Sequence, residues 1–116
     1  MEEQRPTRYY SDMQEKAVSK LLGGQQVSNS GAGLFCKSDV IVKSASLAVE
    51  CKTSVKEKDS FTVKKSWVKK NKDECFQNRM AYTALAFNFG PGQENYFMIN
   101  EKLMSFLCDK LKEEGE

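Results

Sequence analysis

The fold is decided by the stretch SDVIVKSASLAVECK, residues 38–52. Two apolar runs in it are separated by a few small polar residues, which predicts two paired strands joined by a turn. Side chains alternate between the faces of a strand, so Glu50 and Lys52 should point one way and Cys51 the other. Pairing of the two runs as a hairpin would bring Asp39 beside Glu50.

The carboxylates of Asp39 and Glu50 and the ammonium of Lys52 would then share one small patch. Two neighbouring carboxylates repel each other unless a cation lies between them, and hard oxygen ligands of this kind suit Mg²⁺. A metal ion held in this way can orient a water molecule and neutralise the charge that builds up on a phosphate. The pattern therefore favours metal-dependent cleavage of a phosphodiester.

The 116 residues of the chain are enough for one compact domain. A hydrophobic content of 40% is typical of a globular protein and too high for a disordered one. Its apolar runs are all shorter than a membrane helix, and the polar residues 1–8 are unlike a signal peptide. We therefore expect an intracellular protein without a membrane partner.

The chain contains no histidine and four cysteines, at positions 36, 51, 75 and 108. Because the cysteines are widely spaced, we expect free thiols in a reducing compartment and no zinc site. The lack of histidine excludes Ser-His-Asp and Cys-His catalysis and every nuclease class with a histidine base. Proton transfer would have to use a carboxylate, lysine, tyrosine, cysteine or water.

The net charge of +2 is unevenly distributed. Lysines are concentrated between residues 52 and 72, where only Glu57 and Asp59 oppose them, and acidic residues gather at the two ends. A basic middle with acidic ends indicates a surface that faces a polyanion. A solvated, lysine-rich face that binds nothing is the alternative.

Caps and periodicity predict the remaining elements. Residues 1–10 should form a flexible arm, followed by a helix that begins at Ser11, with Gln14 completing a capping box, and ends at Gly23 and Gly24. The order of elements predicts one α/β domain, residues 11–116, with a central mixed sheet flanked by helices. The other expected elements are strands at 25–29, 38–43, 47–53, 81–89 and 95–99, a helix at 67–80 capped by Ser66, and a helix at 101–114 capped by Asn100.

This order of elements resembles the core of the PD-(D/E)xK nuclease superfamily, which is a helix, a three-stranded meander, a helix and a further strand. Asp39 and the tripeptide at 50–52, Glu-Cys-Lys, match its motif in residue type, order and spacing. Ser38 stands where the superfamily motif has its proline. The resemblance covers roughly residues 11 to 90 and implies a restriction-endonuclease-like fold.

Within the superfamily, the chain is most similar to the small Holliday-junction resolvases of archaea and their viral relatives. Those proteins carry a glutamate on the first helix, matched here by Glu15, and a serine in the loop before the motif aspartate, for which Ser30 is the best candidate. The basic residues that flank the resolvase site are not matched one for one.

The resemblance also implies a role for each residue of the site. Asp39 and Glu50 would hold Mg²⁺ or Mn²⁺, with the backbone carbonyl of Cys51 as a further ligand. Glu15 would complete the metal site directly or through water. Lys52 would lie near the attacking water and the phosphate, and Ser30 would belong to the catalytic set.

The implied partner is DNA, with a four-way junction as the substrate. A resolvase must cut two strands symmetrically, which argues for a C₂ homodimer. Its interface is expected to include the aromatic residues of the C-terminal half, and Trp67 should lie in the core or an interface. Two alternatives remain, a nuclease of the same fold with another DNA substrate, such as a nicking or replication-repair type, and a non-catalytic DNA-binding module. The residues expected to contact DNA are Arg5, Arg8, Lys37, Lys56, Lys64, Lys65, Lys69 and Lys70.

Overall fold

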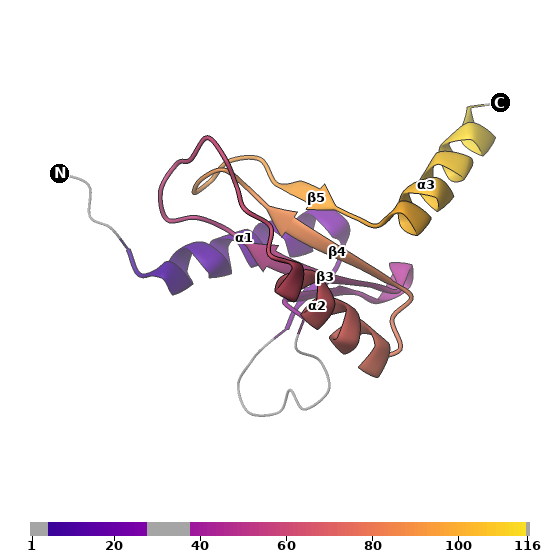
Figure 1. The fold of residues 1–116 in the computed structure, drawn as a ribbon, viewed down its shortest axis with the longest axis horizontal. Helices are drawn as coiled ribbons and strands as arrows, with labels where there is room; N and C mark the ends of the chain where they lie inside the picture. Colours follow the sequence, from indigo (N-terminus) through magenta and orange to yellow (C-terminus); the bar gives the residue numbers. More distant parts are fainter. Residues whose placement is uncertain (1–4, 28–37, 116) are drawn as a thin grey trace.

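A five-stranded mixed sheet lies between two helices in the computed structural model, which describes residues 5–27 and 38–115 (Figure 1). Helix α1 (Thr7–Leu22) covers one face and helix α2 (Lys65–Gln77) the other, while helix α3 (Glu101–Glu114) follows the last strand. The predicted α/β class with a central mixed sheet is confirmed. The strands lie side by side in chain order, β1 (Gln25–Gln26), β2 (Val40–Val42), β3 (Leu47–Lys52), β4 (Tyr82–Phe87) and β5 (Tyr96–Met98).

β3 is the central strand of the sheet. It pairs antiparallel with β2 and parallel with β4, whereas the β1–β2 and β4–β5 pairs are antiparallel. Parallel strands need a long crossover connection, and here the crossover contains α2. The β3–β4 register runs from Leu47 opposite Tyr82 to Lys52 opposite Phe87. The strand that carries the Glu-Cys-Lys tripeptide is therefore hydrogen-bonded on both sides.

The hairpin predicted for residues 38–52 is present. Val40 pairs with Val49 and Val42 with Leu47, and a short 3-10 turn, η1 (Lys43–Ala45), connects the strands. The turn begins at Lys43, so β2 is shorter than the predicted strand at 38–43. Apolar alternation and a run of small residues were enough to specify this pairing.

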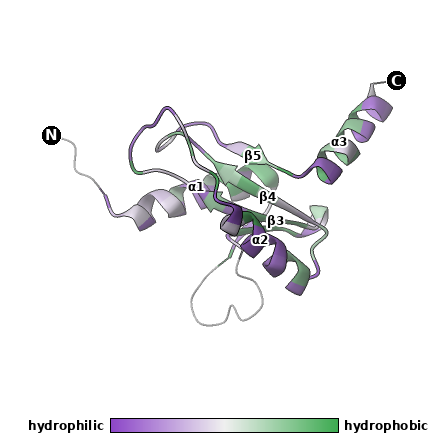
Figure 2. Ribbon diagram, in the orientation of Figure 1, coloured by the Kyte–Doolittle hydropathy of each residue, from purple (hydrophilic) through white to green (hydrophobic). Residues whose placement is uncertain are grey.

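The core has two parts, one on each face of the sheet. Val18 of α1 packs with Val40 and Val49 on one face, and Cys75 of α2 packs with Ile41 and Ala48 on the other. This alternation along β2 and β3 follows from the period of two residues in a strand. Figure 2 shows the hydrophobic residues concentrated along β3 and β4, whereas α2 is largely hydrophilic.

Helix α1 begins earlier than predicted, so the expectation of a flexible arm up to residue 10 was wrong. The helix starts at Thr7 after Pro6, and Ser11 lies inside it without acting as a cap. Arg5 lies 4.7 Å from the ring centroid of Tyr9, and the amide of Tyr9 donates to the carbonyl of Pro6 at 2.9 Å. These contacts extend the helix beyond the start that Ser11 indicated.

The other helix boundaries test the predicted caps. α2 begins at Lys65, with Lys64 as an N-cap that provides no side-chain hydrogen bond, so the predicted cap at Ser66 was wrong. Asn100 does cap α3, because its side-chain oxygen accepts from the amide of Leu103 at 2.9 Å. α1 ends as expected at Gly23, whose φ of 68° is the left-handed conformation that favours glycine.

Three of the four cysteines lie in the described residues, and all three are free thiols, as expected. Cys51 and Cys75 are buried and Cys108 is partly exposed. None of the helices formed by residues 5–27 and 38–115 has both the length and the apolar character needed to cross a bilayer.

Candidate active site

Asp39 lies immediately before β2 and is bound to β3 at two points. Its amide donates to the carbonyl of Val49 at 3.1 Å, and its carboxylate Oδ2 accepts from the amide of Cys51 at 2.8 Å. Continuing the register from Val40 opposite Val49 places Asp39 opposite Glu50. The hairpin therefore brings these two carboxylates to neighbouring positions on the same face.

Glu50 is a buried carboxylate, with 3% of its surface exposed. Its Oε2 lies 3.4 Å from Nζ of Lys52, whereas Oε1 is buried without a hydrogen-bond partner among the described residues. Burial raises the pKa of Glu50, and the charge of Asp39 raises it further, against the lowering effect of Lys70 and Lys52. No group in the described part of the chain donates a hydrogen bond to Oε1.

The other two carboxylates are perturbed in the same direction. Burial raises the pKa of Asp39, opposed by the hydrogen bond from Cys51 and the charges of Lys52 and Lys70. Burial also raises the pKa of Glu15, and the charge of Asp39 adds to it. Glu15 belongs to α1, and its Oε1 accepts a hydrogen bond from Gln26 at 3.2 Å.

The pKa of the Cys51 thiol is shifted in the same direction. Burial raises its pKa, and the charges of Asp39, Glu15 and Glu50 each raise it further. The charges of carboxylates from α1, the residue before β2 and β3 therefore all disfavour the thiolate of Cys51. A thiol in this environment stays protonated, so Cys51 is not a nucleophile.

Lys52 is held between a carboxylate and an aromatic ring. Its Nζ lies 3.4 Å from Oε2 of Glu50 and 4.6 Å from the ring centroid of Trp67. Trp67 is partly buried and packs against Phe61, with their centroids 6.2 Å apart. Trp67, which was expected in the core or an interface, is only partly buried, and its ring restrains the ammonium of Lys52.

Two buried amides hold this part of the sheet together, Gln14, which was expected to complete a helix cap, and Asn71, which the sequence analysis did not single out. Nε2 of Gln14 donates to the carbonyls of Lys52 and Ala86 at 2.8 and 3.3 Å. Asn71 accepts from the hydroxyl of Ser38 at 2.9 Å and donates to two strand carbonyls. The sequence signal was available, because each amide lies four residues before a buried residue of its own helix, Val18 and Cys75.

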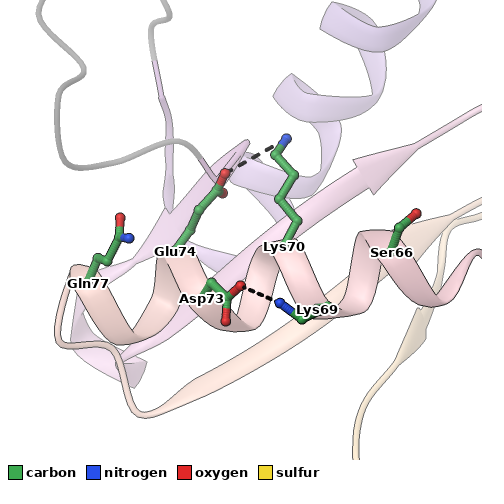
Figure 3. Close-up of a pocket in the computed structure, with 6 residues that line it drawn as sticks. All are labelled: Ser66, Lys69, Lys70, Asp73, Glu74 and Gln77. Atoms are coloured by element: carbon green, nitrogen blue, oxygen red, sulfur yellow. Dashed lines mark hydrogen bonds and ion pairs between the residues drawn. The ribbon is translucent and has the colours of Figure 1, made fainter.

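The predicted DNA-contacting lysines occupy the exposed side of α2 and its approach. Lys56, Lys64 and Lys65 are exposed. Lys69 and Lys70 are also exposed, but they pair within α2, with Asp73 at 3.3 Å and with Glu74 at 3.8 Å (Figure 3). The charge of Lys70 also lowers the pKa values of Asp39 and Glu50.

A shallow groove of about 390 Å³ runs along this side of α2. Figure 3 shows that Lys70 and Glu74 project to one side of the helix, while Lys69 and Asp73 form a second pair. Glu74 is buried, and its Oε2 lacks a partner in the part of the chain that the structure describes.

The remaining predicted site residues are placed as follows. Arg5 and Arg8 are exposed at the start of α1, and the charge of Arg8 slightly opposes the raised pKa of Glu15. Ser30 and Lys37 lie outside the described residues. Among the aromatic residues expected at an interface, Phe97 packs on the α1 side of the core instead. Of the others, Phe87 and Phe89 are half-buried, and Tyr96 and Phe106 are exposed.

The chain's own donors form only part of a metal-binding set. Within residues 5–27 and 38–115, no three His, Cys, Asp or Glu side chains are grouped closely enough to hold a metal ion. Mg²⁺ is commonly held by one or two carboxylates, with water and substrate phosphates filling the other positions. Asp39 and Glu50, together with the unpartnered Oε1, fit that incomplete type of site.

The chain matches no protein-family model, and neither the curated proteins nor the solved structures include one with significant similarity to it.

Proposed function

We propose that the chain is a metal-dependent DNA endonuclease of the PD-(D/E)xK type that hydrolyses phosphodiester bonds at Asp39, Glu50 and Lys52. The observation that carries this proposal is the placement of Asp39 opposite Glu50 on paired strands, with Lys52 3.4 Å from Glu50 and with Oε1 of Glu50 buried without a partner among the described residues. Carboxylates that repel one another in a partly buried site favour a cation between them. Such an arrangement has a stability cost that a purely structural role would not require.

The topology supports a restriction-endonuclease-like fold for the chain. A helix is followed by the antiparallel strands β1, β2 and β3, then by α2, and then by β4 parallel to β3. This order agrees with the helix, meander, helix and further strand of that superfamily. The proposed fold assignment rests on this agreement together with the positions of Asp39 and Glu50.

The residues present fit a bound Mg²⁺ or Mn²⁺. Asp39 and Glu50 would hold it, with the carbonyl of Cys51 as a further ligand and Glu15 acting directly or through water. Oε1 of Glu50, buried and without a described partner, supports this assignment. When bound, the ion would lower the pKa of a coordinated water and offset charge on the phosphate.

The side chains would then perform distinct tasks. Lys52, restrained by Trp67, would place a positive charge where negative charge develops on the phosphate. Glu15, with its raised pKa, is suited to accept a proton from the attacking water. This division of roles needs no histidine, in keeping with the composition.

The proposed substrate is branched DNA inside the cell, with four-way-junction resolution by a homodimer as the specific activity. The exposed basic residues Arg8, Lys64 and Lys65 support a polyanionic partner. A nuclease of the same fold that acts on another DNA substrate is the second candidate. The presence of Lys52 beside an intact acidic pair favours catalysis over a DNA-binding module without activity.

One assay separates these candidates. The protein is incubated with four-way-junction, duplex and single-stranded DNA in Mg²⁺, Mn²⁺ or EDTA. Symmetric cuts in the junction alone support resolution, and cutting of plain duplex supports the second candidate. Binding without cutting under any metal condition contradicts the enzymatic proposal.

Matched variants connect the activity to the site. Asp39→Asn and Glu50→Gln should each lower the cleavage rate by about 10²–10³-fold, the usual cost of removing one key electrostatic group. Asp59→Asn, an exposed carboxylate in the lysine-rich region, is the control and should retain the full rate. Circular dichroism checks that all three variants are folded, and equal rates in the three would remove Asp39 and Glu50 from the reaction.

A further inference from the structure

Helix α3 carries an apolar stripe that nothing in the described part of the chain covers. The helix extends away from the sheet after β5 (Figure 1), and Leu103 is its buried residue. Phe106 anchors the helix by stacking on Tyr82, with the ring centroids 5.9 Å apart. Beyond this anchor, Leu107 is 42% exposed and Leu111 is 68% exposed.

The exposed residues continue the apolar face that begins at the buried Leu103. Leu103, Leu107 and Leu111 are spaced by four residues, so they follow one another along the same face of the helix, and the exposed Met104 lies beside them. A helix of this length is only marginally stable in water unless its apolar face is packed. The stripe begins at a buried residue and continues into solvent, which indicates that the helix has a partner.

We propose that the α3 stripe, defined as residues 103, 104, 107 and 111, binds the same stripe of a second copy of this chain in an antiparallel pair. The charges along α3 are self-complementary in that arrangement. Glu101 and Lys112 are three helical turns apart, so they lie on the same side of the helix, next to the stripe. Two-fold symmetry about Leu107 sets Glu101 of each copy beside Lys112 of the other.

The same register matches the apolar residues. Leu111 of one copy lies at the level of the buried Leu103 of the second, where the exposed Met104 can contact it, and Leu107 lies opposite its own counterpart at the symmetry axis. A parallel pair would instead place the acidic ends of the two helices, Glu113 and Glu114, side by side, which like charges disfavour. The charge pattern therefore selects a second copy in one orientation. This proposal stands whether or not the chain is a nuclease.

Sedimentation equilibrium of the full chain tests the assembly. We expect a dimer whose population rises between about 1 and 500 µM protein, because the paired helices form a small interface. Leu107→Glu would place two carboxylates at the symmetry axis and should weaken association more than tenfold. Leu21→Glu is the matched control, because Leu21 is an exposed leucine of α1, and it should dimerise normally.

Charge reversal tests the orientation. Glu101→Lys and Lys112→Glu should each associate more weakly than the unmodified chain, because each puts like charges together at both ends of the pair. An equimolar mixture of the two variants restores both opposite-charge contacts and should form a mixed dimer with near-normal affinity. A change in the stability of helix α3 would be present in each variant alone and also in the mixture. Recovery of affinity in the mixture therefore reports the contact between the two copies.

Four results would overturn the proposal. The first is an unmodified chain that stays monomeric over the whole concentration range. The second is a dimer that Leu107→Glu leaves unchanged. The third is a mixture of the charge variants that associates no better than either variant alone. Binding of a monomeric chain to anionic phosphatidylserine vesicles would assign the stripe to a membrane surface and would also overturn it.

Discussion

The hydroxyl of Ser38 donates a hydrogen bond to Oδ1 of Asn71 at 2.9 Å, which ties the residue before Asp39 to helix α2. Nδ2 of Asn71 donates to the carbonyls of Ala48 and Ala84, at 3.3 and 3.2 Å. Asn71 itself is 3% exposed. A single buried amide therefore fixes the helix against β3, β4 and the start of β2, and so determines where Asp39 lies.

Replacing Asn71 by leucine should lower both stability and activity. The substitution leaves the Ser38 hydroxyl without its partner and removes two donors to the strands, so we expect a loss of about 2–4 kcal/mol in the free energy of unfolding. Urea denaturation measures this loss. The exposed neighbour Lys72 provides a control, because Lys72→Ala should change stability by less than about 0.5 kcal/mol. Equal stabilities of the two variants would show that the Asn71 contacts contribute nothing.

The stability of the metal-free protein should fall as the pH rises above about 4. The pKa values of Glu50, Asp39 and Glu15 are raised in the folded state from the ordinary 4.5 for glutamate and 3.8 for aspartate. Above those values the folded chain binds more protons than the unfolded chain. The stabilising contribution is therefore complete at lower pH and is lost as the pH rises through the raised pKa values.

Urea midpoints measured in EDTA between pH 4 and pH 8 check this expectation. Glu50→Gln cannot ionise, so its midpoint should decline less than that of the unmodified chain. Addition of Mg²⁺ should stabilise the unmodified chain at neutral pH and the variant much less. If the midpoints of the two proteins changed in parallel with pH, Glu50 would not have a raised pKa in the folded state.

The contact between Lys52 and Trp67 should affect the rate of the proposed reaction more than substrate binding. Removing a cation–π contact by Trp67→Leu frees the ammonium, and we expect kcat to fall by about 2–30-fold with a small change in KM. Trp67→Phe keeps a ring and should lose less. An increase in KM alone would assign Trp67 to DNA binding instead.

Trp67 also offers an optical test of that contact, because it is the single tryptophan of the chain. Lys52→Met removes the charge that lies 4.6 Å from its ring and should change the emission spectrum. Lys56→Met, at an exposed lysine outside this contact, should leave the spectrum unchanged.

The central hairpin was predictable because its signals are local. Apolar alternation and a small-residue turn fix the pairing of β2 with β3, and the register alone then places Asp39 opposite Glu50. The burial of Glu50 was not predictable in this way, because it depends on α2 packing over that face of the sheet. The effect of the Asp39 charge on the pKa of Glu15 also depends on the tertiary packing of α1.

Helix starts and buried amides show where short sequence patterns fail. Ser11 and Gln14 have the spacing of a capping box, but Gln14 turns inward to bind the carbonyls of β3 and β4. Ser66 is a favourable cap residue, yet it lies in the first turn of a helix that begins at Lys65. At Gln14, long-range contacts outweigh a local preference of about 1 kcal/mol.

The parallel pairing of β3 with β4 also has a consequence for synthesis of the protein. Residues 47–52 cannot complete their hydrogen bonding until residues 82–87 have left the ribosome. Until then the nascent chain presents β3 as an open edge, which is the type of surface that recruits other strands. Chains that terminate before residue 82 should therefore be prone to aggregation, even though the whole hairpin has already been made.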